Sequence, residues 1–115
     1  MVNKENADVR LWLAVLSEAT KGGHHPALWL KVSREVSAPT RYRPEVDLGK
    51  LDRLTKEGEN VVVPGKVLSG GRLGHKISIA AVGFSEAARS SLLSSGCSIL
   101  SINEMVGAEQ VRVII

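Results

Sequence analysis

The segment of the chain best suited to bind a charged group lies between two short apolar runs. Residues 61–68 and 77–80 are rich in Val or Ile and bounded by Gly or Pro, so each is predicted to form a buried strand. The loop between them has no carboxylate and offers glycines and side chains that can carry positive charge: Gly70, Gly71, Gly74, Arg72, His75 and Lys76. Exposed backbone N–H groups beside cations are typical of a surface that contacts phosphate groups.

Known nucleotide-binding motifs do not fit this segment. A Walker motif needs Gly five residues before the Gly65-Lys66 pair and Ser or Thr after it, but these positions are Asn60 and Val67. Residues 71–74 form a GxxG sequence, which in K-homology domains joins two helices, whereas here it joins two predicted strands. That fold is therefore excluded. Two interpretations stay open: glycines that let the backbone approach phosphates, or a hairpin tip without a binding role.

Catalytic and metal sites have no support in the residue spacing. His24 and His25 are adjacent, so their side chains point in different directions, and no nearby Cys, Asp or Glu completes a ligand set. Cys97 is the single cysteine and precedes an apolar run, which favours a buried thiol. The serine pairs at 90–91 and 94–95 are interpreted as solvated positions. We expect no enzyme, no cofactor and no metal.

Composition predicts one globular domain. The chain has 115 residues, of which 43% are hydrophobic and 23% charged. Aromatic residues make up 3%, so a set of platforms for stacking unpaired bases is excluded. No apolar run approaches the ~20 residues of a membrane span, and the first residues lack the apolar stretch of a secretory signal. A soluble cytoplasmic protein is expected.

Positive charge is concentrated in the middle of the chain. The formal net charge is +3, and residues 31–76 hold ten Lys and Arg against six Asp and Glu. The cations of this segment are Lys31, Arg34, Arg41, Arg43, Lys50, Arg53, Lys56, Lys66, Arg72 and Lys76. An excess this small does not by itself identify a protein that binds nucleic acid.

Residues 1–37 are predicted to form a helical hairpin. Apolar residues recur at helical spacing through residues 7–20, at Val9, Trp12, Leu13, Leu16 and Ala19, and Gly22 can end this helix. Pro26 starts a second helix to about Val36, with an apolar stripe of Leu28, Val32 and Val36. Residues 38–46 are a basic connector in which Arg41 and Arg43 flank Tyr42.

Residues 47–115 are predicted to form an α/β core. Asp47 caps a short helix whose Leu48, Leu51 and Leu54 face inward, with Lys50, Arg53 and Lys56 outward. After the two strands around the glycine-containing loop comes a helix that Ser85 caps and Gly96 closes. Residues 97–102 and 111–115 are predicted strands, with a short turn of helix at 103–106. This order indicates an α/β sheet with helices packed on it.

The segment from Arg41 to Phe84 resembles a known family. The shared strings are RPEVDLGKLDR (43–53), TKEG (55–58), VVVPGKVL (61–68), His75-Lys76 seven residues after Leu68, and Ala80-Ala81 before Phe84-Ser85. The helical hairpin ahead of them and the sequence SINE (101–104) behind them extend the likeness over nearly the whole chain. On these residues the chain is similar to large-subunit ribosomal protein eighteen-e of archaea and eukaryotes, a relative of bacterial large-subunit protein fifteen.

The resemblance implies a non-catalytic protein that binds large-subunit ribosomal RNA and neighbouring ribosomal proteins during assembly and translation. It also implies a compact single α/β domain, an irregular strand-strand-helix winding with an N-terminal helical hairpin. RNA contacts would then come from the basic connector and a basic, Gly-rich hairpin loop. The expected RNA-binding residues are Lys31, Arg34, Arg41, Tyr42, Arg43, Lys50, Arg53, Lys56, Lys66, Arg72, His75 and Lys76.

Two other classes of function stay open on the residues alone. A protein-interaction module could present the basic segment to an acidic partner, and salt-sensitive binding to protein but not RNA would favour it. A small phosphate-using enzyme would lose turnover when Arg72 or His75 is changed, but the sequence offers no nucleophile for it.

Overall fold

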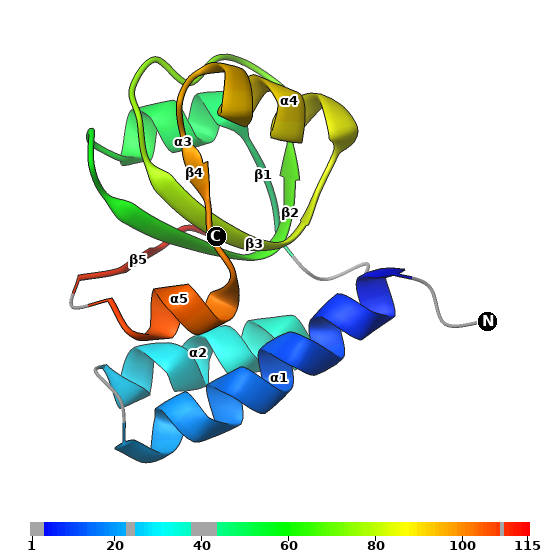
Figure 1. Ribbon diagram of the computed structural model, residues 1–115, viewed down its shortest axis with the longest axis vertical. Helices are drawn as coiled ribbons and strands as arrows, with labels where there is room; N and C mark the ends of the chain where they lie inside the picture. The colour runs from blue at the N-terminus through cyan, green and yellow to red at the C-terminus, as the bar shows by residue number, and fades with distance from the viewer. Residues whose placement is uncertain (1–3, 23–24, 38–43, 109) are drawn as a thin grey trace.

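The structure, a computed structural model, describes residues 4–22, 25–37, 44–108 and 110–115. A parallel sheet forms the middle layer, with helices on both faces (Figure 1). Its strands are β1 (Glu45–Asp47), β2 (Asn60–Leu68), β3 (Ser78–Phe84), β4 (Ser98–Ile99) and β5 (Arg112–Val113). They lie in the order β1-β2-β3-β4, and β5 also pairs with β2, next to Val61 and Val62.

Helices cover the two faces unequally. On one face lie α3 (Leu48–Leu54) and α4 (Glu86–Ser94), above the sheet in Figure 1. On the other face lie α1 (Lys4–Gly22), α2 (Pro26–Ser37) and α5 (Ile102–Val106). The predicted helical hairpin is confirmed as α1 and α2, and the α/β fold class is confirmed by the sheet with its flanking helices. Within the described residues, no helix has the length and apolar character needed to cross a membrane.

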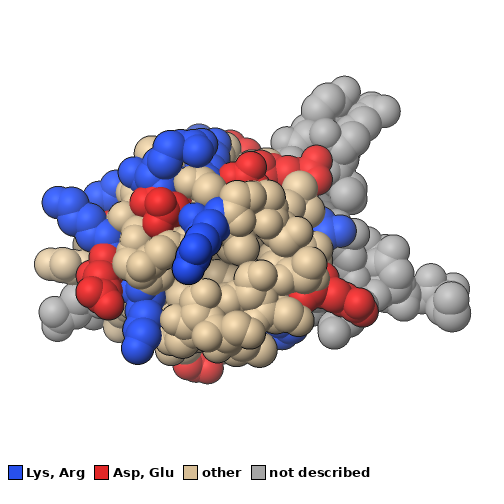
Figure 2. Space-filling model, turned by 90° about the horizontal axis from the view of Figure 1, so that it is seen from above, with Lys and Arg blue, Asp and Glu red and all other residues tan. Residues whose placement is uncertain are grey.

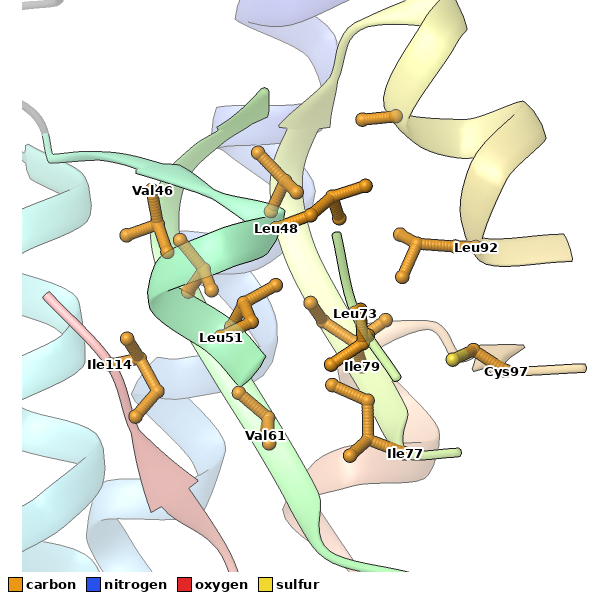
Figure 3. Packing of buried hydrophobic residues seen from close by; sticks show 13 residues of the cluster. Val46, Leu48, Leu51, Val61, Leu73, Ile77, Ile79, Leu92, Cys97 and Ile114 are labelled. Carbon is orange, nitrogen blue, oxygen red and sulfur yellow. The ribbon is translucent and has the colours of Figure 1, made fainter. Parts of the chain in front are cut away.

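The sheet separates two hydrophobic clusters because successive side chains of a strand point to opposite faces. On β2, Val61 and Val63 pack in the cluster beneath α3 and α4, whereas Val62 packs with the helical hairpin and α5. Figure 3 shows the first cluster, where Leu51 of α3 and Leu92 of α4 lie over the strands. A β2 buried on both faces accounts for its continuous run of valines.

Local signals set the starts of the short helices. The Asp47 carboxylate accepts a hydrogen bond from the backbone N–H of Lys50, and Ser85 Oγ accepts one from that of Ala88. Both caps were predicted, and Gly96 after α4 has the positive φ of 83° expected of a residue that closes a helix. Cys97 is buried, as predicted, but it precedes β4 instead of belonging to it.

The expected hairpin between residues 61–68 and 77–80 is wrong. Strands β2 and β3 are parallel, with Asn60 beside Ser78 and Val62 beside Ala80. The loop between them therefore returns across the length of the sheet to bring the chain to the start of β3. Parallel neighbours are usually joined by about a dozen residues or more, whereas residues 69–77 make this connection without a helix.

Other expectations also needed correction. Strand β1 was not predicted; its residues Glu45 and Val46 belong to the expected basic connector. Leu54, expected to face inward, is 44% exposed, and Thr55 after it is buried instead. The predicted strands at 97–102 and 111–115 shorten to β4 and β5, and Ile102 is the first residue of α5.

Candidate nucleic-acid interface

The loop of residues 69–77, here called the glycine loop, lies along α3. The backbone N–H of Gly49 donates to the carbonyl oxygen of Gly70 at 2.9 Å, and that of Gly74 donates to Asp52 Oδ1 at 2.9 Å. Leu73 is buried in the cluster beneath α3 and α4 (Figure 3). These contacts fix the loop on the surface of the domain, so its charged side chains have a defined position relative to those of α3.

His75 fastens the end of the glycine loop to the end of α3. Its Nε2 lies 2.7 Å from Thr55 Oγ1, and its Nδ1 lies 3.4 Å from Asp52 Oδ1. Thr55 Oγ1 also bonds to the carbonyl oxygen of Leu51 at 2.6 Å, which holds the hydroxyl beside the ring. Both ring nitrogens thus face protein groups, and the position of His75 suits holding the loop more than contacting an external ligand.

Three of the six acidic side chains of the basic segment make contacts inside the domain. Asp47 caps α3, and Asp52 accepts from the backbone of Gly74. One oxygen of Glu59 accepts from the N–H of Lys56, and the other pairs with Arg112 at 3.0 Å. These carboxylates stabilise turns and the glycine loop.

Several cations of this region have no such partner. Among the described residues, the side chains of Arg53, Lys56 and Arg72 are exposed and make no hydrogen bond or ion pair. Lys50 differs because its Nζ donates to the carbonyl oxygen of Ile115 at 2.5 Å. The side chain of Lys76 lies against Gly96, the residue that closes α4: a Cβ added to Gly96 would be 2.9 Å from Lys76 Cε.

Half of the twelve predicted site residues lie on two segments that contact each other, α3 with the turn after it and the glycine loop. One group lies on α3, the turn after it and the glycine loop: Lys50, Arg53, Lys56, Arg72, His75 and Lys76. Its five Lys and Arg residues are here called the basic face. In the view of Figure 2, Lys and Arg gather toward one side of the layer above the sheet, with Asp and Glu among them.

The other predicted residues lie elsewhere. Lys31 and Arg34 are exposed on α2, across the sheet from α3. Lys66 is exposed on β2 and, since Val67 packs beneath α3 and α4, its side chain points to the opposite face. Arg41, Tyr42 and Arg43 lie outside the described residues.

One hollow beside the basic face was missed by the sequence interpretation. It has a volume of about 330 Å³ and lies between the glycine loop and α4. Gly71 and Arg72 of the glycine loop line it together with four serines of α4 and its C-cap, Ser90, Ser91, Ser94 and Ser95. The leucines Leu48, Leu73 and Leu92 also line it. The serine pairs repeat at the four-residue spacing of one helix face, but only the folded chain shows that this face meets Arg72.

The structure describes one residue of the histidine pair that the sequence raised as a possible metal ligand. His25 is exposed, and its carbonyl oxygen accepts from the N–H of Trp29 at the start of α2. His24 lies outside the described residues. Within the part of the chain that the structure describes, no three His, Cys, Asp or Glu side chains gather as a metal site would require.

Comparison with known proteins gives the family of this chain. It is 40% identical over 101 residues to large ribosomal subunit protein eL18 of Pyrobaculum aerophilum, which covers 88% of this chain and 82% of the relative. The protein of the same name from Sulfurisphaera tokodaii is 36% identical over 97 residues, covering 84% and 78%.

A third protein of that name, from Methanosphaerula palustris, is 31% identical over 105 residues, covering 91% of this chain and 86% of the relative. No family model matches the chain. Identity of this extent confirms the resemblance carried by the Val-Val-Pro-Gly-Lys-Val-Leu segment, and it supports the expectation of a non-catalytic protein. The chain belongs to the family of large ribosomal subunit protein eL18.

Proposed function

We propose that this protein is a structural constituent of the large ribosomal subunit in the cytoplasm and that it binds large-subunit ribosomal RNA. Contacts with neighbouring ribosomal proteins belong to the same proposal. The basic face, Lys50, Arg53, Lys56, Arg72 and Lys76, supplies the RNA contacts on the described part of the chain. Arg41, Tyr42 and Arg43 of the connector also contact the RNA, and Lys31, Arg34 and Lys66 contribute from other surfaces. His75 holds the glycine loop in place.

The observation that carries this proposal is that acidic side chains of this region have partners inside the domain, whereas several basic side chains of the described residues have none. Asp47 and Asp52 accept backbone N–H groups, and Glu59 pairs with Arg112. Arg53, Lys56 and Arg72 remain exposed without an ion pair among the described residues. Cations free on a rigid surface can displace the counterions that condense on RNA, which gives binding that weakens steeply as salt rises.

Recognition by this surface is of backbone and shape. The chain has little aromatic surface, with 3% Phe, Trp and Tyr, and its two tryptophans, Trp12 and Trp29, are buried against the sheet. Stacking on unpaired bases needs exposed aromatic rings, whereas helical RNA is contacted mainly through phosphates and 2′-hydroxyls. Folded rRNA helices are therefore the expected target.

Binding of the purified protein to large-subunit rRNA over a salt series tests the proposal. Replacing Arg53 and Lys56 together by Gln removes two free cations of the basic face. We expect weaker binding and a plot of log affinity against log salt that is flatter by about 1.4 to 1.8, since each lost phosphate contact removes about 0.7 to 0.9. Arg10→Gln with Lys21→Gln, on exposed positions of α1, changes the net charge equally and should leave the slope unchanged.

The same measurement separates the competing functions. An unchanged slope in the Arg53 and Lys56 variant would contradict the basic face as the RNA contact. Salt-sensitive binding to an acidic protein, with none to rRNA, would favour an interaction module instead.

A further inference from the structure

The hollow between the glycine loop and α4 has the donors of an anion site. Its lining offers the guanidinium of Arg72 and the hydroxyls of Ser90, Ser91, Ser94 and Ser95, and it includes no Asp or Glu. Arg72 keeps its charge at all physiological pH values. A hydroxyl donates one hydrogen bond and carries no charge of its own.

The serine hydroxyls are not used within the protein. On α2, Ser37 Oγ donates to the carbonyl oxygen of Ser33 at 2.8 Å, a common use of a helical serine. The four serines of the hollow make no such side-chain bond among the described residues. Each hydroxyl is therefore available to a group that enters the hollow.

Backbone groups of the glycine loop add to these donors. Gly71 has a φ of 78°, a conformation in which successive N–H groups can point toward the same side. Within the described chain, the backbone N–H groups of Gly71 and Arg72 make no hydrogen bond. The nearby N–H groups of Gly49 and Gly74 are paired, with Gly70 and Asp52 respectively.

The floor of the hollow is apolar. Leu48, Leu73 and Leu92 line it and are each at most 5% exposed. One permanent positive charge among neutral donors matches a phosphodiester, which carries one negative charge.

We propose that this hollow binds one phosphodiester group of ribosomal RNA, through Arg72 and the serines of α4. This inference rests on the proposed function and adds α4 to the RNA contacts proposed for the basic face. It assigns a shared role to the serine pairs, which the sequence alone presents as solvated positions.

Two kinds of substitution distinguish the donors. Replacing Ser90, Ser91, Ser94 and Ser95 by Ala should weaken rRNA binding about tenfold, because hydrogen bonds to a charged group are lost, with the salt slope unchanged, because no cation is removed. Arg72→Gln should weaken binding and flatten the slope by about 0.7 to 0.9. Ala favours helix more than Ser, so α4 should persist. Ser17→Ala, on an exposed position of α1, is the matched control and should bind like the unchanged protein.

Combining the serine and Arg72 substitutions tests whether they share one phosphate. The combined variant should lose less affinity than the product of the two separate losses, because the second change removes a contact to a group already released. Full multiplication of the losses would contradict a shared phosphate. A serine variant that binds rRNA as tightly as the unchanged protein would overturn the proposal while leaving the proposed function intact.

Failure of the proposed function has a different outcome. The unchanged protein would then show no salt-dependent binding to rRNA at all. A titration with inorganic phosphate, followed by the amide NMR signals of residues 71–73 and 90–95, distinguishes the source of the anion. Tight binding of inorganic phosphate at the hollow, with no effect of the serine substitutions on rRNA, would assign the site to free phosphate and overturn its role in RNA binding.

Discussion

Gly49 and Gly71 contact each other through their backbones at the point where the glycine loop crosses α3. A Cβ added to Gly71 would lie 2.8 Å from the Cα of Gly49 and 2.9 Å from its nitrogen, and Gly71 has a φ of 78°. Beside this contact the N–H of Gly49 donates to the carbonyl oxygen of Gly70. The approach of two backbones sets the distance between the cations of α3 and Arg72.

Gly71→Ala should therefore destabilise the domain through two effects. The left-handed conformation costs a non-glycine residue roughly 1 to 2 kcal/mol, and the clash with backbone atoms of Gly49 should add at least about 1 kcal/mol. Urea unfolding measures the sum. Gly58→Ala is the control, because Gly58 has a similar φ of 85° but nothing within 4 Å of an added Cβ. Equal losses of stability in the two variants would contradict the contact with Gly49.

Gly65 should tolerate no side chain. An added Cβ would overlap the carbonyl oxygen of Pro44, which accepts the hydrogen bond from the N–H of Lys66 at 3.0 Å and begins the pairing of β1 with β2. Gly65→Ala should cost more than about 2 kcal/mol of unfolding free energy, since a strand must move. Gly83→Ala on β3 meets only Lys66 Cγ at 4.0 Å and should cost less than about 0.5 kcal/mol. Thermal unfolding that ranks the two variants alike would refute this account of Gly65.

Thr55→Val should weaken the attachment of the glycine loop. The hydroxyl of this buried residue bonds to the carbonyl oxygen of Leu51 and lies 2.7 Å from His75 Nε2, so its removal breaks both hydrogen bonds. The expected loss is about 1 to 3 kcal/mol. Thr20 makes a comparable bond to the carbonyl oxygen of Ser17 on α1 without a second partner, so Thr20→Val should cost under about 1 kcal/mol. Calorimetric unfolding compares them, and a negligible effect at Thr55 would show that His75 is held by Asp52 alone.

Arg41→Ala with Arg43→Ala tests the connector, in which these two residues lie outside the described part of the chain. Two cations in a segment that joins the helical hairpin to the sheet are expected to contact phosphates. Their loss should weaken rRNA binding and flatten the salt slope by about 1.4 to 1.8. The variant with Arg10 and Lys21 replaced by Gln again provides the charge control. An unchanged slope would remove the connector from the proposed RNA surface.

Local chemistry made part of this fold predictable. Asp47 and Ser85 are helix caps whose effect depends on residues within one helical turn. The four-residue spacing of the apolar residues Trp12 and Leu16 can likewise be recognised within a single helix, without knowledge of what packs against it. The direction of β3 was not accessible in the same way. A run of valine and isoleucine predicts a strand but not which neighbour it pairs with, or whether the pair is parallel.

The candidate site was predictable by residue type but not by arrangement. Charge pointed to Arg53, Lys56 and Arg72, and the structure places Arg53 on α3, Lys56 just after it and Arg72 in the glycine loop that lies along α3. Charge alone did not reveal that Asp52 and Glu59 have partners inside the domain. Asp52 accepts a hydrogen bond from Gly74, and Glu59 forms an ion pair with Arg112, and both partners are far away in the sequence. The serine-lined hollow arises from the packing of α4 beside the glycine loop, a tertiary contact without a local sequence signal.

Sedimentation of native cell extract on a gradient tests the central claim most directly, with the protein followed at moderate and at high salt. The account predicts that the protein migrates with the large ribosomal subunit and remains there through a salt wash that removes loosely attached proteins. A protein found only at the top of the gradient, with intact large subunits further down, would contradict a structural role in that subunit.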